Sequence, residues 1–421
     1  MNVHETEKLY ALFELSGIAQ TENAENADII IFNTCCVREG AETRVIGNLG
    51  IVKKLKEKKP SLIVAVCGCM TQQKAVAEKL HKRCPFINII TGTYKLSKLP
   101  HMVNLIANGE KFIMDLETDL TVPCGINELK RSDNVNNFVN IMYGCNNFCT
   151  YCIVPYVKGR ERSRRKNDIV EEVRTLIGKG CKEITLLGQN VNSYNDGNYN
   201  FRDLLDELSD LDGEFWIKFM TSHPKDLSND VIDLIAKKEK LADYIHLPLQ
   251  SGSDRILALM NRKYDIAAYM EKIDRIKEKM PDAGITSDII VGFPTETEKD
   301  FILTEEAVQK VGYNNLFTFI YSKRTGTPAA VMEGQVPEET KKERIARLIA
   351  LQAEIANKKA KECIGKTYRV LCDSKSDKLL TGKTASDRVI IFEGKEALYN
   401  KFVDVKVTQV KNSKLYGEAV N

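Results

Sequence analysis

The sequence predicts an α/β protein with three parts: an open α/β sheet at the N-terminus, a partial (β/α)6 barrel in the centre and a small all-β barrel at the C-terminus. Helical and strand patterns alternate along residues 1–123. Six apolar runs, each followed by a helical stretch, then repeat over residues 138–336. The last part, residues 364–421, holds short strand patterns and no convincing helix.

The N-terminal part is expected to alternate helices with parallel strands. Its helical patterns cover residues 7–17, 39–57 and 72–81, and its strand patterns cover residues 27–33 and 62–67. The runs Asn33-Thr34-Cys35-Cys36 and Cys67-Gly68-Cys69-Met70 follow the two strands. Ligands bind at the carboxyl ends of strands in such sheets, so these cysteines are candidate functional residues. Residues 124–137, rich in polar and small residues, are expected to be a linker.

The central part is expected to form a partial barrel of six strand–helix units. The apolar runs lie at residues 138–142, 183–187, 215–220, 243–247, 285–291 and 315–321. Six such units in succession fit a partial barrel better than a second open sheet. A helix with a charged, solvated face is expected to follow Pro337 and to connect the barrel to the C-terminal part.

The C-terminal part is expected to be a small all-β barrel. Its strand patterns cover residues 368–372, 389–392 and 402–410, with glycines between them. Residues 364–421 carry eleven lysines and arginines against seven aspartates and glutamates, whereas the net charge of the whole chain is only +3. The basic surplus therefore lies in a module built like an RNA-binding domain.

Composition limits the class of protein. The chain has 421 residues, of which 43% are hydrophobic and 28% are charged, as in an ordinary globular protein. Its apolar runs fall far short of the roughly 18 residues needed to span a bilayer, so no membrane association is expected. Residues 1–5 lack the basic and apolar stretches of a signal peptide, so a cytoplasmic location with reduced thiols is expected.

Twelve cysteines in such a chain point to metal or cluster ligation rather than to a disulfide framework. The strongest pattern is Cys145, Cys149 and Cys152, a C-x3-C-x2-C triplet just after the first barrel strand. Three thiolates hold three irons of a [4Fe-4S] cube and leave the fourth iron open to an exogenous ligand. The alternatives are three buried thiols in a loop and a zinc site that lacks its fourth ligand.

The run from Met142 to Pro155 resembles the cluster loop of radical S-adenosylmethionine (SAM) enzymes, and its continuation from Lys158 to Arg164 resembles the methylthiotransferases among them. Within that family, the segment from Phe317 to Ala330 is most similar to the members that modify N6-isopentenyladenosine in tRNA. The resemblance covers nearly the whole chain. It implies a methylthiotransferase domain (1–123), a linker (124–137), a radical SAM partial barrel (138–336), a connecting helix (337–363) and a TRAM-like RNA-binding barrel (364–421).

The resemblance implies two [4Fe-4S] clusters and SAM as cofactors. The open iron of one cluster would chelate SAM, and one electron would release a 5′-deoxyadenosyl radical that takes hydrogen from carbon 2 of the adenine. An aromatic C–H is far too weak an acid for a side-chain base, which explains the need for a radical. Sulfur would then come from the second cluster and the methyl group from a second SAM.

The implied partners are the anticodon stem-loop of tRNA, an electron donor such as flavodoxin or ferredoxin, and iron–sulfur or sulfur carrier proteins, with the chain itself a monomer. Three alternatives stay open. Related enzymes act on threonylcarbamoyl-adenosine in tRNA or on a ribosomal protein, and a non-catalytic iron–sulfur protein could bind RNA through the C-terminal barrel alone.

The SAM contacts are expected at the carboxyl ends of successive barrel strands. Matching the family's strand-end motifs nominates Gln189, Asn192, Ser222, His246, Gln250 and Asp288. A single strand-end His or Gln more often satisfies loop backbone, but several such motifs at one end favour a binding role. The run 158–166 holds six basic residues and one acidic residue, and it is expected to meet SAM carboxylate or tRNA phosphate unless it is merely a solvated face.

The second cluster is where this sequence departs from the family, whose members hold it with three cysteines. Only Cys35 and Cys69 match, because the chain begins inside the motif that carries the first cysteine and lacks the strand before it. We therefore expect that the natural chain starts upstream; otherwise Cys36 or Cys67 is recruited, although Cys67 lies on the opposite pleat from its neighbours. The remaining cysteines are expected to be structural thiols: Cys84, Cys124, Cys181, Cys363 and Cys372.

Overall fold

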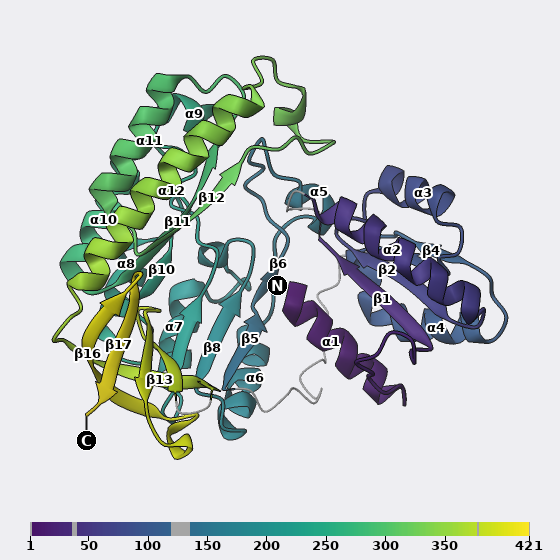
Figure 1. Cartoon of the computed structure of the whole chain (residues 1–421), viewed down its shortest axis with the longest axis horizontal. Helices are drawn as coiled ribbons and strands as arrows, with labels where there is room; N and C mark the ends of the chain where they lie inside the picture. The colour runs from purple at the N-terminus through teal and green to yellow at the C-terminus, as the bar shows by residue number, and fades with distance from the viewer. Residues whose placement is uncertain (1, 36–39, 119–134, 377–378, 421) are drawn as a thin grey trace. The chain divides into compact units, whose positions relative to one another are not determined.

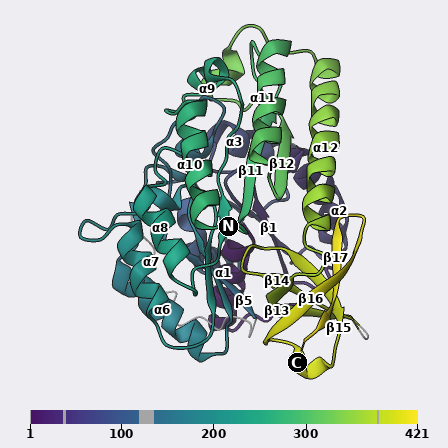
Figure 2. The ribbon, with the colours of Figure 1, turned by 90° about the vertical axis from the view of Figure 1, so that its left-hand side faces the viewer.

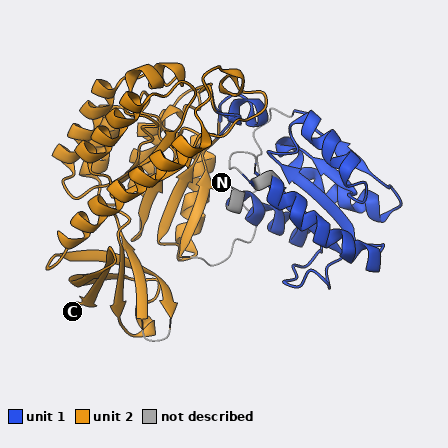
Figure 3. Cartoon of the chain, turned by 45° about the horizontal axis from the view of Figure 1, so that its top comes forward, with its two compact units in different colours: residues 1–132, 143–146, 152–162 blue, residues 133–142, 147–151, 163–421 orange. Residues whose placement is uncertain are grey.

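The computed structural model describes residues 2–35, 40–118, 135–376 and 379–420. The chain divides into two compact units (Figure 3). The N-terminal unit comprises Met1–Ser132, Tyr143–Asn146 and Cys152–Arg162; the C-terminal unit comprises Asp133–Met142, Asn147–Tyr151 and Ser163–Asn421. Among the helices of the described residues, none combines the length and the apolar character that crossing a membrane requires.

The N-terminal unit contains a four-stranded parallel sheet in the order β1-β2-β3-β4 (Figure 1). Its strands are β1 (Ile29–Thr34), β2 (Ile63–Gly68), β3 (Ile89–Thr91) and β4 (Ile113–Asp115). Its helices are α1 (Asn2–Leu15), α2 (Ala41–Lys58), α3 (Lys74–Arg83), the 3-10 helix η1 (Thr93–Lys98), α4 (Leu99–Ala107) and α5 (Val154–Lys158). The open α/β sheet is confirmed. Helix α1 starts earlier than expected because residues 2–6 contain no breaker and Glu5 favours a helix N-terminus.

Both faces of this sheet are covered, which explains why β2 is continuously apolar. On one face, Ala65 and Cys67 pack with Phe13 of α1 and Val103 of α4. On the other face, Val64 and Val66 pack with side chains of α2 and α3. Alternate residues of β2 therefore belong to different cores, as the pleat of a strand requires.

The C-terminal unit contains six parallel strands, one in each of the six expected apolar runs. They are β5 (Asn136–Asn140), β8 (Glu183–Leu187), β9 (Trp216–Phe219), β10 (Tyr244–His246), β11 (Gly284–Val291) and β12 (Asn315–Ile320). They form two sheets, β5-β8-β9 and β10-β11-β12. An isolated parallel bridge pairs Ile217 of β9 with Leu241, which precedes β10. This is the expected partial barrel. Strand β5 takes the last two residues of the expected linker, and residues 124–134 lie outside the described part.

Helices cover the outside of these strands (Figures 1 and 2). They are α6 (Lys166–Gly178), α7 (Phe201–Ser209), α8 (Asn229–Lys237), α9 (Asp254–Leu259), α10 (Ile266–Lys279), α11 (Glu298–Val311) and α12 (Glu338–Lys361). One large core lies between helices and strands, with Ile184 and Ile289 packed among Val173, Tyr269 and Val308. Two short strands, β6 (Met142–Tyr143) and β7 (Arg162–Ser163), precede and follow the cysteine-containing segment.

Helix α12 forms where a helix was expected after Pro337, but its charged residues are not all solvated. Lys341 and Arg344 are buried, and Arg344 lies 2.8 Å from the carboxylate of Glu296. The helix packs along β12 and α11, so part of its charged surface faces the barrel. The expectation of a purely solvated charged face was wrong for this reason.

The C-terminal residues form a closed five-stranded barrel in the order β13-β14-β15-β17-β16. Its strands are β13 (Thr367–Ser376), β14 (Leu379–Thr384), β15 (Val389–Glu393), β16 (Phe402–Lys411) and β17 (Lys414–Ala419). Val370, Ile390, Phe392 and Val405 fill its interior. The expected all-β barrel is confirmed, with two strands, β14 and β17, that the sequence pattern did not indicate. Closure leaves the barrel without unpaired edges.

This barrel covers the amino-terminal ends of the central strands. The ring of Phe402 meets the edge of Trp216, the first residue of β9, with ring centroids 4.7 Å apart. Asn136, the first residue of β5, donates a 3.1 Å hydrogen bond to Asp373. A side chain at Gly284, the first residue of β11, would collide with the carbonyl oxygen of Ser386 at 2.0 Å. The carboxyl ends of the central strands lie at the opposite end.

Candidate active site

The six nominated SAM contacts lie at the carboxyl ends of four neighbouring strands. Gln189 and Asn192 follow β8, and Ser222 follows β9. His246 ends β10 and Gln250 follows it, whereas Asp288 lies within β11, three residues before its last residue. Backbone hydrogen bonds join the successive loops: Val191 N–H donates to Thr221 O at 3.1 Å and Gln250 N–H donates to Asp288 O at 2.8 Å. The structure therefore brings the nominated residues to one end of the barrel.

His246 and Asp288 form a pair across β10 and β11. His246 Nε2 lies 3.6 Å from Asp288 Oδ2, and its Nδ1 lies 3.0 Å from the Thr286 hydroxyl. The edge of Phe317 on β12 packs against the imidazole, with ring centroids 5.8 Å apart. Three adjacent strands thus hold the imidazole in place beside a partly exposed carboxylate.

Three residues at these strand ends adopt left-handed backbone conformations that side chains disfavour. They are Thr221 (φ 70°), Gln250 (φ 72°) and Thr295 (φ 68°). Gln250 is held in place on both sides, because its N–H bonds to Asp288 and its carbonyl accepts from Ile290 N–H at 3.0 Å. Strained residues of this kind concentrate at functional sites, where the surrounding structure holds them.

Several buried polar atoms at the same end have no hydrogen-bond partner within the described residues. They are Asn190 Oδ1, both amide atoms of Asn192, Ser222 Oγ, His223 Nε2 and Gln250 Oε1. Buried polar groups in folded proteins are nearly always satisfied, so a cluster of unpaired ones indicates a polar ligand. Amide, hydroxyl and imidazole groups match the amino, carboxylate, ribose and adenine groups of SAM, and the site fits that cofactor.

His223, which follows the nominated Ser222, was not among the expected SAM contacts. Burial, and then the charges of Arg262 and Lys225, lower the pKa of His223 to about 2, so the ring is neutral. Its Nδ1 accepts the Lys225 N–H at 3.3 Å, which leaves the proton on Nε2. The unpaired atom is therefore a hydrogen-bond donor.

Cys149 belongs to the C-terminal unit and is buried. Arg262 Nη1 donates to its sulfur at 3.3 Å, and Asn261 Nδ2 donates to the neighbouring Phe148 carbonyl at 3.0 Å. On the other side, the Thr150 hydroxyl donates to Leu259 O at 2.8 Å. The turn after α9 thus holds the middle of the cysteine loop in place.

Cys145 and Cys152 belong to the N-terminal unit. Cys145 N–H donates to Gly159 O at 3.0 Å, and a side chain at Gly144 (φ 74°) would lie 2.1 Å from the Arg160 carbonyl oxygen. Glycine is required there because two backbone segments approach closely. After Cys152, Ile153 enters the core beneath α2 and α3. Each of these cysteines is therefore attached to a packed element.

The chemistry of the donor set fits a [4Fe-4S] cluster. The ten described cysteines are thiols rather than disulfides, and three of them follow one another at the cluster-loop spacing. Within the described ranges, the side chains of His, Cys, Asp and Glu are not gathered into a group of three that would hold a metal ion. The ligand assignment therefore depends on residue type and spacing.

Cys35 and Cys69 lie just after β1 and β2, at the carboxyl edge of the N-terminal sheet. Cys69 N–H donates to Thr34 O at 3.1 Å. A side chain at Gly68 (φ 103°) would lie 2.4 Å from that same Thr34 oxygen, so glycine permits the close approach. The two strand ends that carry the nominated cysteines are thus bound to each other.

Cys67 has a different environment. It is fully buried in the core beneath α1 and α4, and its sulfur lies 3.5 Å from the carbonyl oxygen of Phe32. Burial, and then Cys69, raise the pKa of Cys67 to about 12, so it remains a neutral thiol. Cys36, the other alternative ligand, and Cys124 lie outside the described residues. The other expected structural thiols are buried: Cys84, Cys181, Cys363 and Cys372.

The basic run 158–166 is largely engaged within the chain. Arg164 is buried and lies 2.6 Å from Glu172, with a second bond to Asn140 O at 2.7 Å. Lys166 pairs with Glu207 and sits over a tyrosine ring. The guanidinium of Arg162 stacks on Tyr94 at 5.2 Å. The expectation that the run as a whole faces a ligand was wrong for Arg164 and Lys166, because carboxylates of neighbouring helices hold them.

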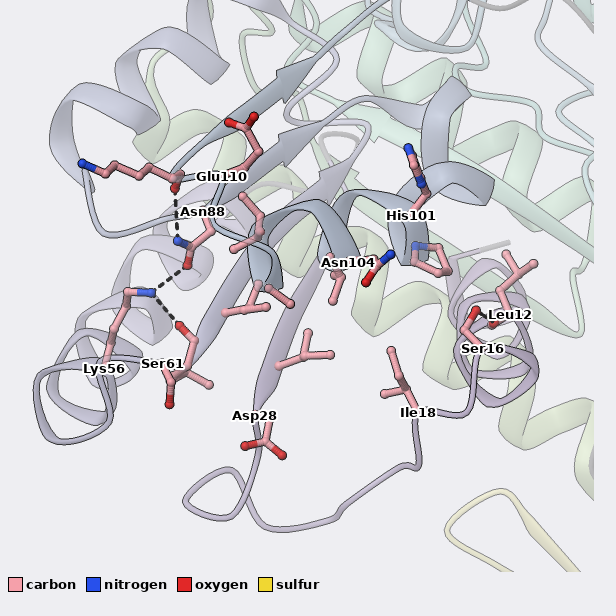
Figure 4. A pocket seen from close by; sticks show the side chains of 18 of the residues that line it. Leu12, Ser16, Ile18, Asp28, Lys56, Ser61, Asn88, His101, Asn104 and Glu110 are labelled. Carbon is pink, nitrogen blue, oxygen red and sulfur yellow. Dashed lines mark hydrogen bonds between the residues drawn. The ribbon is translucent and has the colours of Figure 1, made fainter.

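A cavity of about 1270 Å3 lies in the N-terminal unit between α1, α4 and the sheet (Figure 4). Asp28, Ser61 and Asn88, which precede the first three strands, line it together with Lys56. These residues mark the amino edge of the sheet, whereas Cys35 and Cys69 lie at the carboxyl edge. The cavity is therefore separate from the cysteine site.

Arg262 and Tyr264 are site residues that the sequence pattern did not reveal. Arg262 is buried, and its guanidinium donates to the Cys149 sulfur and to the Tyr264 hydroxyl. The sequence Asn261-Arg262-Lys263 predicts only an ordinary polar turn between two helices. Its role depends on contact with residues more than a hundred positions earlier, which no local signal shows.

Three family models match the chain. Residues 1–92 match "Uncharacterized protein family UPF0004", residues 139–308 match "Radical SAM superfamily", and residues 361–420 match "TRAM domain". The radical SAM match begins in β5 and extends into α11, so it includes all the nominated SAM contacts.

Solved structures share the fold. The radical SAM methyltransferase TsrM from Kitasatospora setae, solved with cobalamin and a [4Fe-4S] cluster, has a TM-score of 0.57 and 13% identity over 78% of this chain and 74% of that one. The cobalamin-dependent SAM radical enzyme OxsB has a TM-score of 0.52 and 13% identity over 83% and 53%. At these identities, the likeness shows the fold alone.

Curated relatives are similar along the whole chain. The tRNA-2-methylthio-N(6)-dimethylallyladenosine synthase of Caldicellulosiruptor saccharolyticus is 49% identical over 100% of this chain and 90% of its own length. Those of Acetivibrio thermocellus and Clostridium botulinum are each 48% identical, again over 100% of this chain and over 89% and 95% of theirs. The chain therefore belongs to the radical SAM methylthiotransferase family that includes the tRNA-2-methylthio-N(6)-dimethylallyladenosine synthases.

Proposed function

We propose that this chain adds a methylthio group to carbon 2 of N6-isopentenyladenosine, also called N6-dimethylallyladenosine, next to the anticodon of tRNA. The observation that carries the proposal is the full-length similarity to three curated synthases of this substrate, at 48–49% identity. The relatives' names supply the substrate, and the strand-end residues described above supply a site with matching chemistry.

Cys145, Cys149 and Cys152 would hold the SAM-cleaving cluster, and the six nominated strand-end residues would hold SAM. When bound, the cluster and SAM supply a 5′-deoxyadenosyl radical. The chain's own residues then have to bind SAM, orient it and exclude water from the site. The unpaired atoms of Ser222, Gln250 and Asn192 are available for hydrogen bonds to SAM, because no described residue occupies them.

Cys35 and Cys69 would ligate the second, sulfur-donating cluster. Both lie at the carboxyl edge of their sheet, whereas Cys67 points into a packed core. The geometry therefore favours Cys35 and Cys69 over Cys67.

The C-terminal barrel would contribute tRNA affinity. Lys406, Lys411 and Lys414 are exposed on the adjacent strands β16 and β17, and Lys411 lies over the ring of Tyr416. Lysines beside an aromatic ring suit a nucleic-acid backbone and its bases. With the domain bounds predicted from the sequence, residues 1–123 would be the sulfur-donor domain, residues 138–336 the radical SAM barrel and residues 364–421 the RNA-binding domain.

Further partners follow from the chemistry. The cluster needs a one-electron donor such as flavodoxin or ferredoxin, and the spent second cluster needs an iron–sulfur or sulfur carrier protein. We place the reaction in the cytoplasm, where tRNA is modified, with a monomeric enzyme.

The test uses anaerobically reconstituted protein, SAM, dithionite and tRNA that carries N6-isopentenyladenosine. We expect 5′-deoxyadenosine in solution and the 2-methylthio nucleoside in the digested tRNA by mass spectrometry. Parallel reactions contain threonylcarbamoyl-adenosine in tRNA or the ribosomal protein. If one of these is modified instead, that molecule is the substrate and the proposed one is wrong. If protein with its full iron content forms no 5′-deoxyadenosine, the remaining hypothesis is a non-catalytic RNA-binding protein.

A further inference from the structure

From a buried position, Arg262 contacts two other loops and a tyrosine of its own turn. It lies between α9 and α10 and is only 4% exposed. Its Nη1 donates to Cys149 Sγ at 3.3 Å, its Nη2 donates to Pro248 O at 3.1 Å, and its Nε donates to the Tyr264 hydroxyl at 3.1 Å. None of the steps assigned above uses this side chain.

The charge of Arg262 lacks the partner that other buried arginines have. Arg164 lies 2.6 Å from Glu172 and Arg344 lies 2.8 Å from Glu296. Within the described residues, no carboxylate lies within 4.0 Å of Arg262. A buried cation without an anion is strongly unfavourable, so a compensating negative charge is required at this position.

Only one of the three contacts can carry that negative charge. The Tyr264 phenol is neutral, since burial raises its pKa above the usual value. A carbonyl oxygen such as that of Pro248 has no net charge. The remaining partner is the sulfur of Cys149, which is an anion when it is a cluster ligand.

We propose that Arg262 is a positioning residue for the SAM-cleaving cluster: it neutralises the Cys149 thiolate through an N–H···S hydrogen bond and so raises the reduction potential of the cluster. The inference rests on the proposed function in taking Cys149 as a ligand. Hydrogen bonds to cluster sulfurs and net charge nearby are among the factors that set such potentials. A buried positive charge favours the reduced cluster, which carries one more electron.

The fork of the guanidinium adds a second effect. One nitrogen holds Cys149 while the other holds Pro248, which lies in the loop between His246 and Gln250. Tyr264 reinforces the same loop by donating to Leu249 O at 2.7 Å. Arg262 therefore fixes the sulfur relative to the strand end nominated for SAM. A lysine has the charge but not the planar fork, so it could not serve both contacts equally.

The experiment measures the midpoint potential of one cluster, without tRNA. A Cys35→Ala/Cys69→Ala background leaves Cys145, Cys149 and Cys152 as the only nominated ligands, and reductive titration is followed by EPR with iron analysis alongside. We expect Arg262→Gln to shift the midpoint to lower potential. A tenfold fall in the reduction equilibrium constant corresponds to about 59 mV for one electron.

Three further variants make the result specific. Arg262→Lys keeps the charge, so its midpoint should lie between those of the background protein and Arg262→Gln. Tyr264→Phe loses a positioning hydroxyl but keeps the guanidinium, so its shift should be smaller. Arg275→Gln removes a partly exposed arginine on α10 that pairs with Asp233, and it should leave the midpoint unchanged.

Circular dichroism checks folding in each variant. If Arg262→Gln does not fold, Arg262→Lys decides: a lowered midpoint supports the proposal and an unchanged one overturns it. An unchanged midpoint in folded Arg262→Gln, or an equal shift in Tyr264→Phe or Arg275→Gln, also overturns it. A cluster that survives Cys149→Ala would overturn the ligand assignment itself, which separates failure of the proposed function from failure of this inference.

Discussion

Lys218 on β9 lies 2.9 Å from Asp387 in the turn between β14 and β15, so a buried ammonium joins the partial barrel to the C-terminal barrel. The same ammonium lies 2.5 Å from Glu183 on β8, and both Lys218 and Glu183 are less than 10% exposed. Burial would lower the pKa of Lys218, but Glu183 and Asp387 outweigh it and raise the pKa. A buried ion pair therefore attaches the C-terminal barrel to the radical SAM barrel.

Lys218→Met should destabilise the protein by about 3–5 kcal/mol, because it leaves the buried carboxylate of Glu183 without its partner. Urea denaturation measures the change in the free energy of unfolding. The control is Lys366→Met, which removes an exposed pair with Asp282 at the same interface and should cost less than about 1 kcal/mol. Adding Glu183→Leu to Lys218→Met should recover stability. Equal losses of stability from both substitutions would show that the buried group of Lys218, Glu183 and Asp387 contributes no more than an exposed ion pair.

Replacing Lys406, Lys411 and Lys414 by Gln should weaken tRNA binding and reduce its dependence on salt, with SAM cleavage unchanged. Each lost phosphate contact should lower the slope of log K against log salt by about 1. This triple variant tests RNA binding better than removal of residues 364–421, which would also uncover Trp216 and Lys218.

The matched control for the tRNA experiment replaces three exposed lysines of α3, namely Lys74, Lys79 and Lys82, by Gln. It removes the same charge from another surface. An equal loss of affinity in the control would mean that only net charge matters, and the proposed binding face on β16 and β17 would be wrong.

Single Ala substitutions in the two cysteine sets should separate two chemical steps. Replacing Cys145, Cys149 or Cys152 should abolish 5′-deoxyadenosine, because the SAM-cleaving cluster loses a ligand. Replacing Cys35 or Cys69 should lower the iron content and the yield of methylthio nucleoside while 5′-deoxyadenosine still forms. Cys181→Ala, at a buried thiol bonded to backbone carbonyls, is the control and should retain iron. Full SAM cleavage after loss of Cys149 would contradict the assignment.

Glu296 should give stability a pH dependence between about pH 4.5 and 7. Its buried carboxylate accepts from Gly292 N–H at 2.7 Å and from Arg344, but burial outweighs both and raises its pKa from 4.5 to about 7. In that range the folded state binds more protons than the unfolded state, so this group's contribution is full below pH 4.5 and is lost as pH rises through 7.

The measurement for Glu296 is the difference in free energy of unfolding between the unmodified chain and Glu296→Gln, followed from pH 4.5 to 8. The difference should fall as pH rises. Glu298→Gln is the control with the opposite sign, because Arg347 lowers the pKa of the exposed Glu298. A flat or rising curve for Glu296→Gln would show that Arg344 keeps Glu296 ionised throughout.

Local patterns were enough to predict the order of the parts and most of their elements. Each expected apolar run of the central part contains a strand, because buried parallel strands are apolar on both faces and each is followed by an amphipathic helix. The C-x3-C-x2-C spacing and the polar strand-end motifs are likewise local, because each consists of residues that are close together in the sequence. All six nominated SAM contacts accordingly lie at one end of the barrel.

Tertiary structure decided what depends on residues far apart in the chain. Strands β14 and β17 carry weak local signals and form because barrel closure pairs them with β13, β15 and β16. Arg344 looks solvated in the sequence but is buried, since α12 packs where Glu296 can neutralise it. Arg262 meets Cys149 across 113 positions. A sequence window shows charge and polarity, whereas burial and the partner that balances a charge arise only when distant segments pack together.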